Sequence, residues 1–260
     1  MALYDSIGRS YDTTRKADPT LTQSIARHLQ LKPGASYLDI ACGTGNYTVA
    51  LQKLGAQMYG LELAATMLDQ ARPKSDHVKW LQGNAEALPF PDRSFDGATC
   101  TVAIHHMEHL WRAFEEAFRV IKSGRFVIFH WEHAQMIRYW LFEYFPRGFK
   151  AVLDQMPMTD DVVHHLKRAG FSKVDFDAWE VPRDIQDLFL YSGKYRPEIY
   201  LDATVRAGIS TFAGGFINSE ETATGCARLE ADIKSGRIDE VMAKYRHDLG
   251  DYLFIVATKD

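Results

Sequence analysis

The stretch Tyr37-Leu38-Asp39-Ile40-Ala41-Cys42-Gly43-Thr44-Gly45-Asn46 decides the fold of this chain. It starts as a short apolar strand, passes through a tight turn and continues into a predicted helix over Asn46–Leu54. The two glycines let the backbone turn sharply and approach a ligand closely. In open α/β sheets, ligands bind at the carboxyl ends of the strands, which is where this turn lies.

The turn predicts a ligand that is cationic and carries no phosphate. A dinucleotide-binding turn has the pattern GxGxxG, but Thr48 stands at the position of its third glycine. Asp39, just before the turn, would repel a pyrophosphate, whereas it suits an ammonium group directly or through water. Both features count against a NAD-dependent oxidoreductase.

Strands and helices alternate outward from this stretch, which predicts a mostly parallel sheet with helices on both faces. The further predicted strands are Gln57–Leu61, Val78–Leu81, Asp96–Ile104, Arg125–His130, Val174–Val181 and Asp251–Thr258. The predicted helices are Ala64–Ala71, His109–Ile121 and Asp160–Ala169, together with an N-terminal helical segment that ends at Gln30 and includes a helix start at Asp18-Pro19.

We expect three kinds of region. Residues 1–30 form a helical lid, and residues 31–133, 159–182 and 251–260 form the sheet-containing core. Residues 134–158 and 183–250 are expected to be helical insertions that build a cap beside the carboxyl ends of the strands.

Two more signals follow the next strands. Glu62 ends the second strand, where a carboxylate can accept both hydroxyls of a ribose. The run Gly83–Phe90 follows the third strand, and the amide of Asn84 can read an adenine edge.

Together these features resemble the class I S-adenosylmethionine-dependent methyltransferases of the small-molecule type with a DxxxGxG loop, over about Ser36–His130 and the last strand. The resemblance implies S-adenosyl-L-methionine as cofactor and a Rossmann-like, seven-stranded sheet with an antiparallel last strand. It places Asp39 at the methionine part and Glu62 at the ribose. The full cofactor-binding set it implies is Tyr11, Asp39, Ala41, Gly43, Gly45, Glu62, Leu63, Met67, Asn84, Ala85, Glu86, Thr101 and Val102.

The chain departs from the family pattern in three places. Ala41 stands where a first glycine is common, and Asn84 stands where aspartate is frequent. The turn Ile121–Arg125 is shorter than usual, so we expect an altered approach to the fifth strand.

A catalytic base is not compulsory, because much of the catalysis of methyl transfer can come from proximity and alignment. The candidate bases are His106 first, then His105 and His109; the alternative is that they hydrogen-bond the start of a helix. Tyr4, Tyr11 and Arg15 are similar to a segment that closes over the cofactor, or they belong to a surface helix.

Other segments allow several interpretations. The aromatic stretch Ala134–Phe149 is a substrate wall, a membrane-contacting helix or, preferably, cap core. The run Tyr191–Arg196 holds an anionic group of the substrate or is a solvated turn. His164 and His165 lack metal-ligand spacing, and Cys42 lacks a neighbouring base in the sequence.

Composition narrows the setting. The 260 residues carry a formal net charge of −4, which does not favour nucleic acid as substrate. Three cysteines without a paired spacing, no signal peptide and no apolar run near 20 residues favour a cytoplasmic protein.

We therefore expect methyl transfer to an O, N or C atom of a small organic molecule. The alternatives are a quinone- or lipid-type C-methyltransferase, a cofactor-binding enzyme such as a cyclase that transfers no methyl group, and a module that senses the cofactor. The sequence does not predict the oligomeric state.

Overall fold

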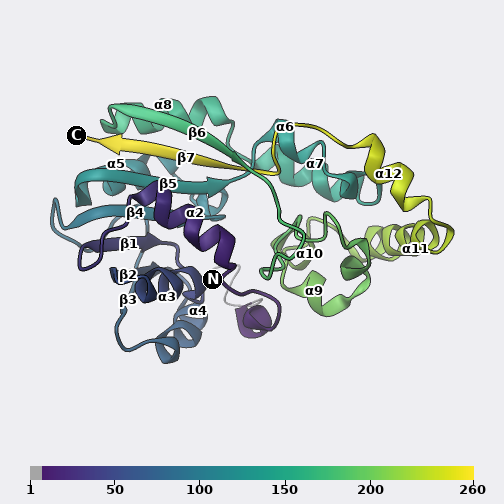
Figure 1. Ribbon diagram of the computed structural model, residues 1–260, viewed down its shortest axis with the longest axis horizontal. Coiled ribbons are helices and arrows are strands. Elements are labelled where there is room, and N and C mark those ends of the chain that lie inside the picture. The colour runs from purple at the N-terminus through teal and green to yellow at the C-terminus, as the bar shows by residue number, and fades with distance from the viewer. Residues whose placement is uncertain (1–7) are drawn as a thin grey trace.

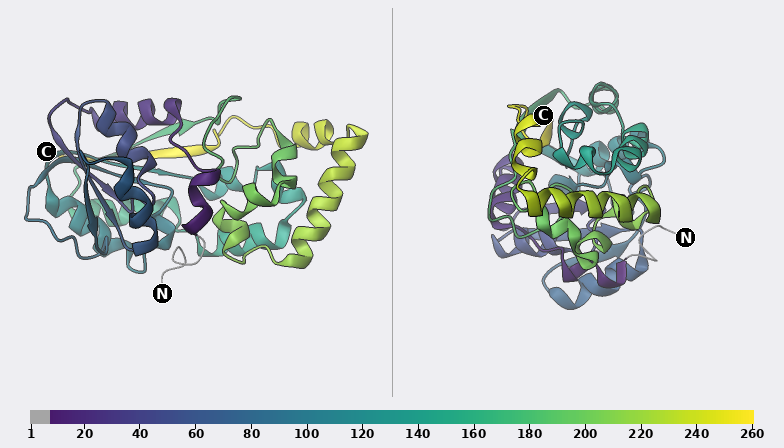
Figure 2. Two further views of the ribbon diagram at one scale, coloured as in Figure 1. Left: turned by 90° about the horizontal axis from the view of Figure 1, so that it is seen from below. Right: turned by 90° about the vertical axis from the view of Figure 1, so that its right-hand side faces the viewer.

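The computed structural model describes residues 8–260, so Tyr4 of the predicted lid lies outside the described residues. A sheet with flanking helices and a second group of helices lie end to end along the long axis (Figures 1 and 2). The N-terminal 3₁₀ helix η1 (Gly8–Thr13) lies between these two parts. We refer to the first as the sheet part and to the second as the helical part.

The sheet has seven strands in the order β3-β2-β1-β4-β5-β7-β6. β7 pairs antiparallel with both β5 and β6, and the other strand pairs are parallel. This arrangement confirms the predicted Rossmann-like sheet with an antiparallel last strand. The strands are β1 (Ser36–Ile40), β2 (Gln57–Glu62), β3 (Lys79–Gln82), β4 (Phe95–Thr101), β5 (Ile121–His130), β6 (Lys173–Trp179) and β7 (Tyr252–Lys259).

Helices cover both faces of the sheet (Figure 1). Successive residues of β5 join two different hydrophobic clusters, because side chains alternate across a strand. Val127 and Phe129 pack in the cluster that includes α2 (Pro19–Leu29) and α3 (Asn46–Lys53). Phe126 and Ile128 pack with α5 (Leu110–Val120) and α8 (Thr159–Ala169). The first cluster continues into the helical part, so one core joins the two parts.

The predicted helix start at Asp18-Pro19 is confirmed, and the described part of the predicted N-terminal helical segment consists of two helices, η1 and α2. The backbone N–H of Leu21 donates to Asp18 Oδ1 at 3.0 Å, and Pro19 occupies the first helical position. Asp18 itself is extended, with φ −79° and ψ 132°, and it therefore separates α2 from η1.

The fifth strand begins at Ile121, four residues before the predicted start at Arg125. A Cβ on Gly124, whose φ is 146°, would lie 2.2 Å from the carbonyl oxygen of Asp96. Glycine lets β5 pass this close to β4, and the short turn becomes part of the strand.

The two predicted cap segments are more broken than expected. Residues 134–155 form three short helices instead of one, and residues 183–196 contain no helix. Pro146 and Pro197 each open a helix in these segments, as expected for a residue that fits only the first turn. The helices are α6 (His133–Met136), η4 (Trp140–Glu143), α7 (Pro146–Gln155), η5 (Pro197–Leu201), α9 (Ala203–Ala207), α10 (Ser210–Ala213), α11 (Ser219–Ser235) and α12 (Ile238–Lys244).

The aromatic side chains of Ala134–Phe149 form the core of the helical part. Tyr139, Trp140, Tyr144 and Phe145 are all fully buried, which supports the cap-core interpretation. Among the described residues, the helices all lack the length and apolar character needed to cross a bilayer.

Candidate functional site

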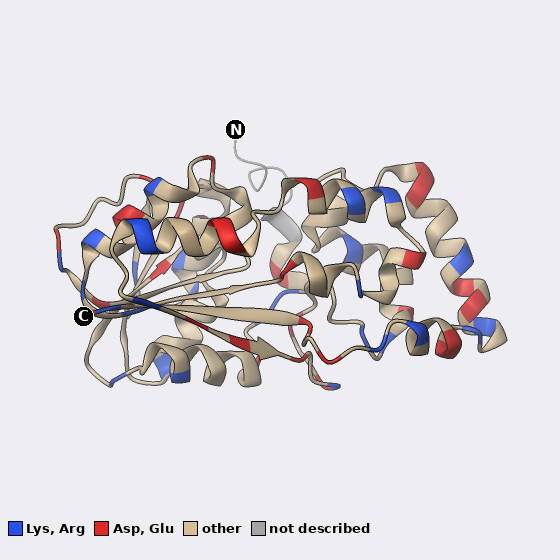
Figure 3. Cartoon of the chain, turned by 90° about the horizontal axis from the view of Figure 1, so that it is seen from above, with Lys and Arg blue, Asp and Glu red and all other residues tan. Residues whose placement is uncertain are grey.

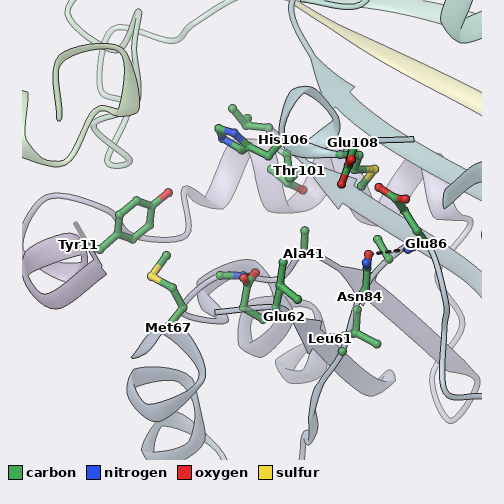
Figure 4. Close-up of a pocket in the computed structure, with 17 residues that line it drawn as sticks. Tyr11, Ala41, Leu61, Glu62, Met67, Asn84, Glu86, Thr101, His106 and Glu108 are labelled. Carbon is green, nitrogen blue, oxygen red and sulfur yellow. Dashed lines mark hydrogen bonds between the residues drawn. The ribbon is translucent and has the colours of Figure 1, made fainter. Parts of the chain in front are cut away.

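A cavity of about 330 Å³ opens at the carboxyl ends of β1, β2, β3 and β4 (Figure 4). Residues from four separate strand ends converge on it, as expected for a parallel sheet. Among the predicted site residues, those that line it are Tyr11, Ala41, Gly43, Glu62, Leu63, Met67, Asn84, Ala85, Glu86, Thr101, Val102 and His106.

Glu62 is fixed in the cavity wall by the turn that follows β1. Its Oε2 accepts the backbone N–H of Gly43 at 3.0 Å, and its Oε1 accepts that of Ala64 at 2.9 Å. The side chain is only 8% exposed, so the carboxylate is held in place before any ligand arrives. Each carboxylate oxygen has further lone pairs that can accept from a hydroxyl group.

Asp39 lines a smaller adjoining cavity of about 60 Å³, together with Arg15. Burial raises the pKa of Asp39 to about 7; the hydrogen bond from Thr48, at 2.5 Å, opposes this effect, and the charge of Glu62 adds to it. A cation in this cavity would favour the ionised carboxylate.

The turn after β1 uses left-handed backbone at Ala41, Gly43 and Gly45, with φ of 58°, 57° and 76°. Gly45 does not line the cavity. A Cβ there would lie 2.2 Å from a ring carbon of Trp80, so Gly45 allows the turn to pack closely against this indole. Val102 is also left-handed, with φ 53°, which is an outlier for a β-branched residue.

The loop after β3 is held by hydrogen bonds within it, and it also lines the cavity. Asn84 Oδ1 accepts the backbone N–H of Glu86 at 2.9 Å (Figure 4). The carboxylate of Glu86 accepts the backbone N–H of His109 at 2.8 Å, and its other oxygen lies 3.1 Å from His109 Nδ1. Glu86 therefore stabilises the start of α5 as well as lining the cavity, and His109 does not face it.

The two foremost candidate bases face different surroundings. His106 lines the main cavity, across from Glu62 and Met67, while His105 faces a second cavity described below (Figure 4). Burial lowers the pKa of His106 to about 4 and that of His105 well below its usual value. Both rings are therefore neutral at pH 7, and each is a weak proton acceptor.

Helix η1 and the segment after it are held by a polar network that the sequence did not reveal. Asp12 Oδ1 accepts the hydroxyl of Thr44 at 2.6 Å and the amide of Asn46 at 3.1 Å. The guanidinium of Arg15 donates to Asp187 at 2.5 Å, and the hydroxyl of Tyr47 donates to the same carboxylate at 3.0 Å. Asp187 lies 172 positions from Arg15, so no local pattern could have predicted this pair.

The remaining candidates lie away from the cavity. Lys194 forms an ion pair with Asp251 at 2.8 Å, and Tyr191 stacks on Tyr139 with ring centres 3.8 Å apart, so the run Tyr191–Arg196 has a structural role. Within residues 8–260, no cluster of His, Cys, Asp and Glu is suited to a metal ion, His164 and His165 included. Burial raises the pKa of the Cys42 thiol well above its usual range, so it is a poor nucleophile.

Comparisons with known proteins identify relatives of this chain. Residues 38–129 match the family model of the methyltransferase domain. The chain is 39% identical over 114 residues to 2-phytyl-1,4-naphtoquinone methyltransferase of Thermosynechococcus vestitus, a match that covers 41% of this chain and 51% of that protein. The chain thus spans about half the length of this relative.

Two further relatives match over most of their length. Demethylmenaquinone methyltransferase of Symbiobacterium thermophilum is 26% identical over 74% of this chain and 82% of that protein. A crystal structure from Anabaena variabilis, assigned as a methyltransferase from an antibiotic biosynthesis pathway, is 35% identical. It superposes with a TM-score of 0.85 over 94% of this chain and 99% of that one. The fold, the cavity at the strand ends and these relatives agree: the chain belongs to the class I S-adenosylmethionine-dependent methyltransferases.

Proposed function

We propose that this chain transfers a methyl group from S-adenosylmethionine to an O, N or C atom of a small organic molecule. The observation that carries the proposal is the main cavity, with a buried carboxylate on each of two neighbouring strands. Glu62 ends β2 inside this cavity, and Asp39 of β1 lines the smaller adjoining cavity.

The residues fit this cofactor. Glu62 suits the two ribose hydroxyls, and Met67 and Leu63 offer apolar contact to an adenine ring. Asp39 suits an ammonium group, while the guanidinium of Arg15 in the same small cavity suits a carboxylate. When bound, the cofactor supplies a methyl group activated by its sulfonium sulfur.

The acceptor would approach from the side of His106 and Thr101. His106 is neutral at pH 7, so it can accept a hydrogen bond from the acceptor, but its pKa of about 4 makes it a weak general base. We therefore expect the rate to come mainly from holding the acceptor close and aligned, an effect that can supply about 7–11 kcal/mol. Tyr11 and Arg15 would cover the cofactor and exclude water.

A small acceptor fits better than a nucleic acid. Acidic and basic residues are interspersed over both parts of the molecule in the view of Figure 3, and no broad basic face appears there. Cys42, Cys100 and Cys226 are free thiols, which suits the proposed cytoplasmic setting.

A quinone-type acceptor, methylated at carbon, is the second candidate. The names of the two curated relatives favour it, since both refer to quinones. The aromatic stretch Ala134–Phe149 no longer adds support, because its side chains are buried in the helical part.

Calorimetric titration with S-adenosylmethionine and S-adenosylhomocysteine tests the proposal. Glu62→Gln should weaken binding of both by about tenfold to a hundredfold, because a charge-assisted hydrogen bond is lost. Asp69→Asn, which changes a carboxylate that is 69% exposed on α4 (Ala65–Ala71), is the matched control and should bind normally.

Product analysis then separates the alternatives. Formation of S-adenosylhomocysteine together with a methylated small molecule supports the proposal. Binding with no turnover of any acceptor would indicate a sensing module or a non-transferring enzyme. Methylated RNA or protein as the sole product would contradict a small-molecule acceptor.

A further inference from the structure

A second cavity, of about 110 Å³, lies between the ends of β4 and β5 and the helical part. His105, His106 and Trp131 form its wall on the sheet side, and they are faced by Val152 of α7 and by Met156 just after it. His106 lines both this cavity and the main one, so the two share a wall. A molecule in the second cavity would lie beside the proposed position of the cofactor.

The lining of the second cavity contains no charged side chain. Besides the residues above, Phe216 is aromatic, and Gln155, Ser210 and Thr211 supply neutral polar groups. Moving an ionised group into such surroundings is costly unless an opposite charge meets it. The lining therefore favours a neutral molecule with a flat apolar body.

Two residues of the sheet-side wall, Trp131 and His105, carry buried polar atoms without a partner, and so does His130, which does not line the cavity but contacts Trp131. Trp131 Nε1 and His105 Nδ1 are buried and have no hydrogen-bond partner among the described residues, and the same holds for both ring nitrogens of His130. The ring of His130 stacks on Trp131 with centres 4.7 Å apart, and His105 lies 5.1 Å from Trp131. Leaving a buried donor without a partner costs about 1–3 kcal/mol. A ligand oxygen that accepts a hydrogen bond from this wall would therefore stabilise the complex.

The volume limits the size of the ligand. An apolar cavity of about 150 Å³ holds benzene in another protein, so a cavity of about 110 Å³ leaves no room for two fused rings, and a single ring is the largest body to consider.

From the lining, the unpaired donors and the volume, we propose that the second cavity binds the ring of a neutral, oxygen-bearing, single-ring acceptor such as a phenol. Trp131 donates to the ring oxygen, and α7 and α10 close over the ring. This inference rests on the proposed function, because the ring's reacting atom must point past His106 into the main cavity. It separates this chain from the relative whose name refers to a two-ring naphthoquinone.

Binding to the intact protein in the presence of S-adenosylhomocysteine tests the inference without relying on turnover. The probes are phenol, toluene without the oxygen, 4-hydroxybenzoate with an added charge, and 2-naphthol with an added ring. Dissociation constants come from ligand-observed NMR. Toluene should bind about fivefold more weakly than phenol, and 4-hydroxybenzoate and 2-naphthol at least about tenfold more weakly.

Two variants examine the cavity itself. Trp131→Phe keeps an aromatic ring without the donor and should weaken phenol about fivefold while leaving toluene unchanged. Thr211→Leu fills the cavity and should weaken both. Trp111→Phe, on the part-exposed face of α5, is the matched control.

The outcomes distinguish the inference from the proposed function. Normal S-adenosylhomocysteine affinity in all variants, together with the expected losses for phenol, supports the inference. If 2-naphthol binds as tightly as phenol, or if Trp131→Phe leaves phenol binding unchanged, the inference is overturned while the proposed function stands. If the wild-type protein binds no S-adenosylhomocysteine, the proposed function fails first.

Discussion

The two cavities are built in different ways. Apart from Tyr11, the main cavity takes its lining from residues 41–108, which lie at or after the carboxyl ends of β1, β2, β3 and β4. The second cavity takes its lining from residues 105–216, which come from the sheet, α7 and the segment around α10. The cofactor cavity thus depends on local turns, and the proposed acceptor cavity depends on how the helical part packs against the sheet. A change in one part should therefore affect one ligand more than the other.

Asp187 connects the two parts, so its loss should have the largest effect. Burial by itself lowers the pKa of Arg15, but Asp187 raises it well above its usual value, which shows how strongly the guanidinium depends on this partner. Asp187→Asn leaves a buried cation without its counter-ion, which costs about 3–5 kcal/mol. We expect the free energy of unfolding, measured in denaturant, to fall by that amount.

The control for Asp187→Asn is a surface pair. Arg27 and Asp177 lie 2.9 Å apart, but both are substantially exposed. Asp177→Asn should change the free energy of unfolding by less than about 1 kcal/mol. Equal effects of the two variants would mean that Asp187 does not hold the parts together.

Two glycine variants should show that the helical part and the cofactor cavity can be disturbed independently. In the helical part, a Cβ on Gly225 would lie 2.3 Å from a ring carbon of Phe145 and 2.6 Å from the carbonyl oxygen of Tyr144. Gly225→Ala should cost about 1–3 kcal/mol in overpacking and disturb acceptor turnover. Affinity for S-adenosylhomocysteine, measured by calorimetry, should stay within about twofold, because a cavity built from local turns is distant from this contact.

Gly45→Ala should have the opposite effect, since it should disturb cofactor binding directly. The new Cβ would overlap Trp80, so the turn after β1 must shift and cofactor affinity should be lost. Thr224→Ala, on the exposed face of α11, is the control for helix substitution. Loss of cofactor affinity in Gly225→Ala would show that the two cavities are not independent.

The pH dependence of cofactor binding should identify Asp39. Because its pKa is raised to about 7, the carboxyl is increasingly protonated below pH 7, and a cationic ligand must displace that proton. Affinity should therefore rise with pH up to about 7 and fall by up to about tenfold for each pH unit below it. Calorimetry between pH 5.5 and 7.5 measures this effect, and Asp39→Asn should remove it. A flat profile for the wild-type protein would mean that Asp39 does not meet the cation.

The same contrast explains which features the sequence predicted. Asp39 and Glu62 lie at the carboxyl ends of β1 and β2, and Asn84 comes shortly after β3, so the strand pattern alone brought them to one edge of the sheet. The pattern could not reveal that Asp187 reaches Arg15, or that Trp131 faces α7, because these contacts depend on tertiary packing between distant segments. The breaks in the predicted cap helices, by contrast, had local signals in Pro146 and Pro197.

The neutral state of the candidate bases was also beyond sequence reasoning. A histidine after a parallel strand is a reasonable base at its usual pKa, but burial lowers the pKa of His106 to about 4. Burial depends on the surrounding fold, so the spacing of His105 and His106 gave no sign of it.

The smallest expected effect concerns Ala41, where the chain departs from the common glycine. Its φ of 58° is left-handed, a conformation that costs a residue with a Cβ roughly 1–2 kcal/mol. Ala41→Gly removes this cost but adds about 0.4–1 kcal/mol of entropy to the unfolded chain, so we expect a net gain between zero and about 1.6 kcal/mol. Thermal unfolding measures it, with Ala64→Gly as control, because Ala64 has an ordinary φ of −79° and should only lose stability. If both variants lose the same stability, the backbone at Ala41 is not strained. Alanine is then no less favourable than glycine at this edge of the cofactor cavity.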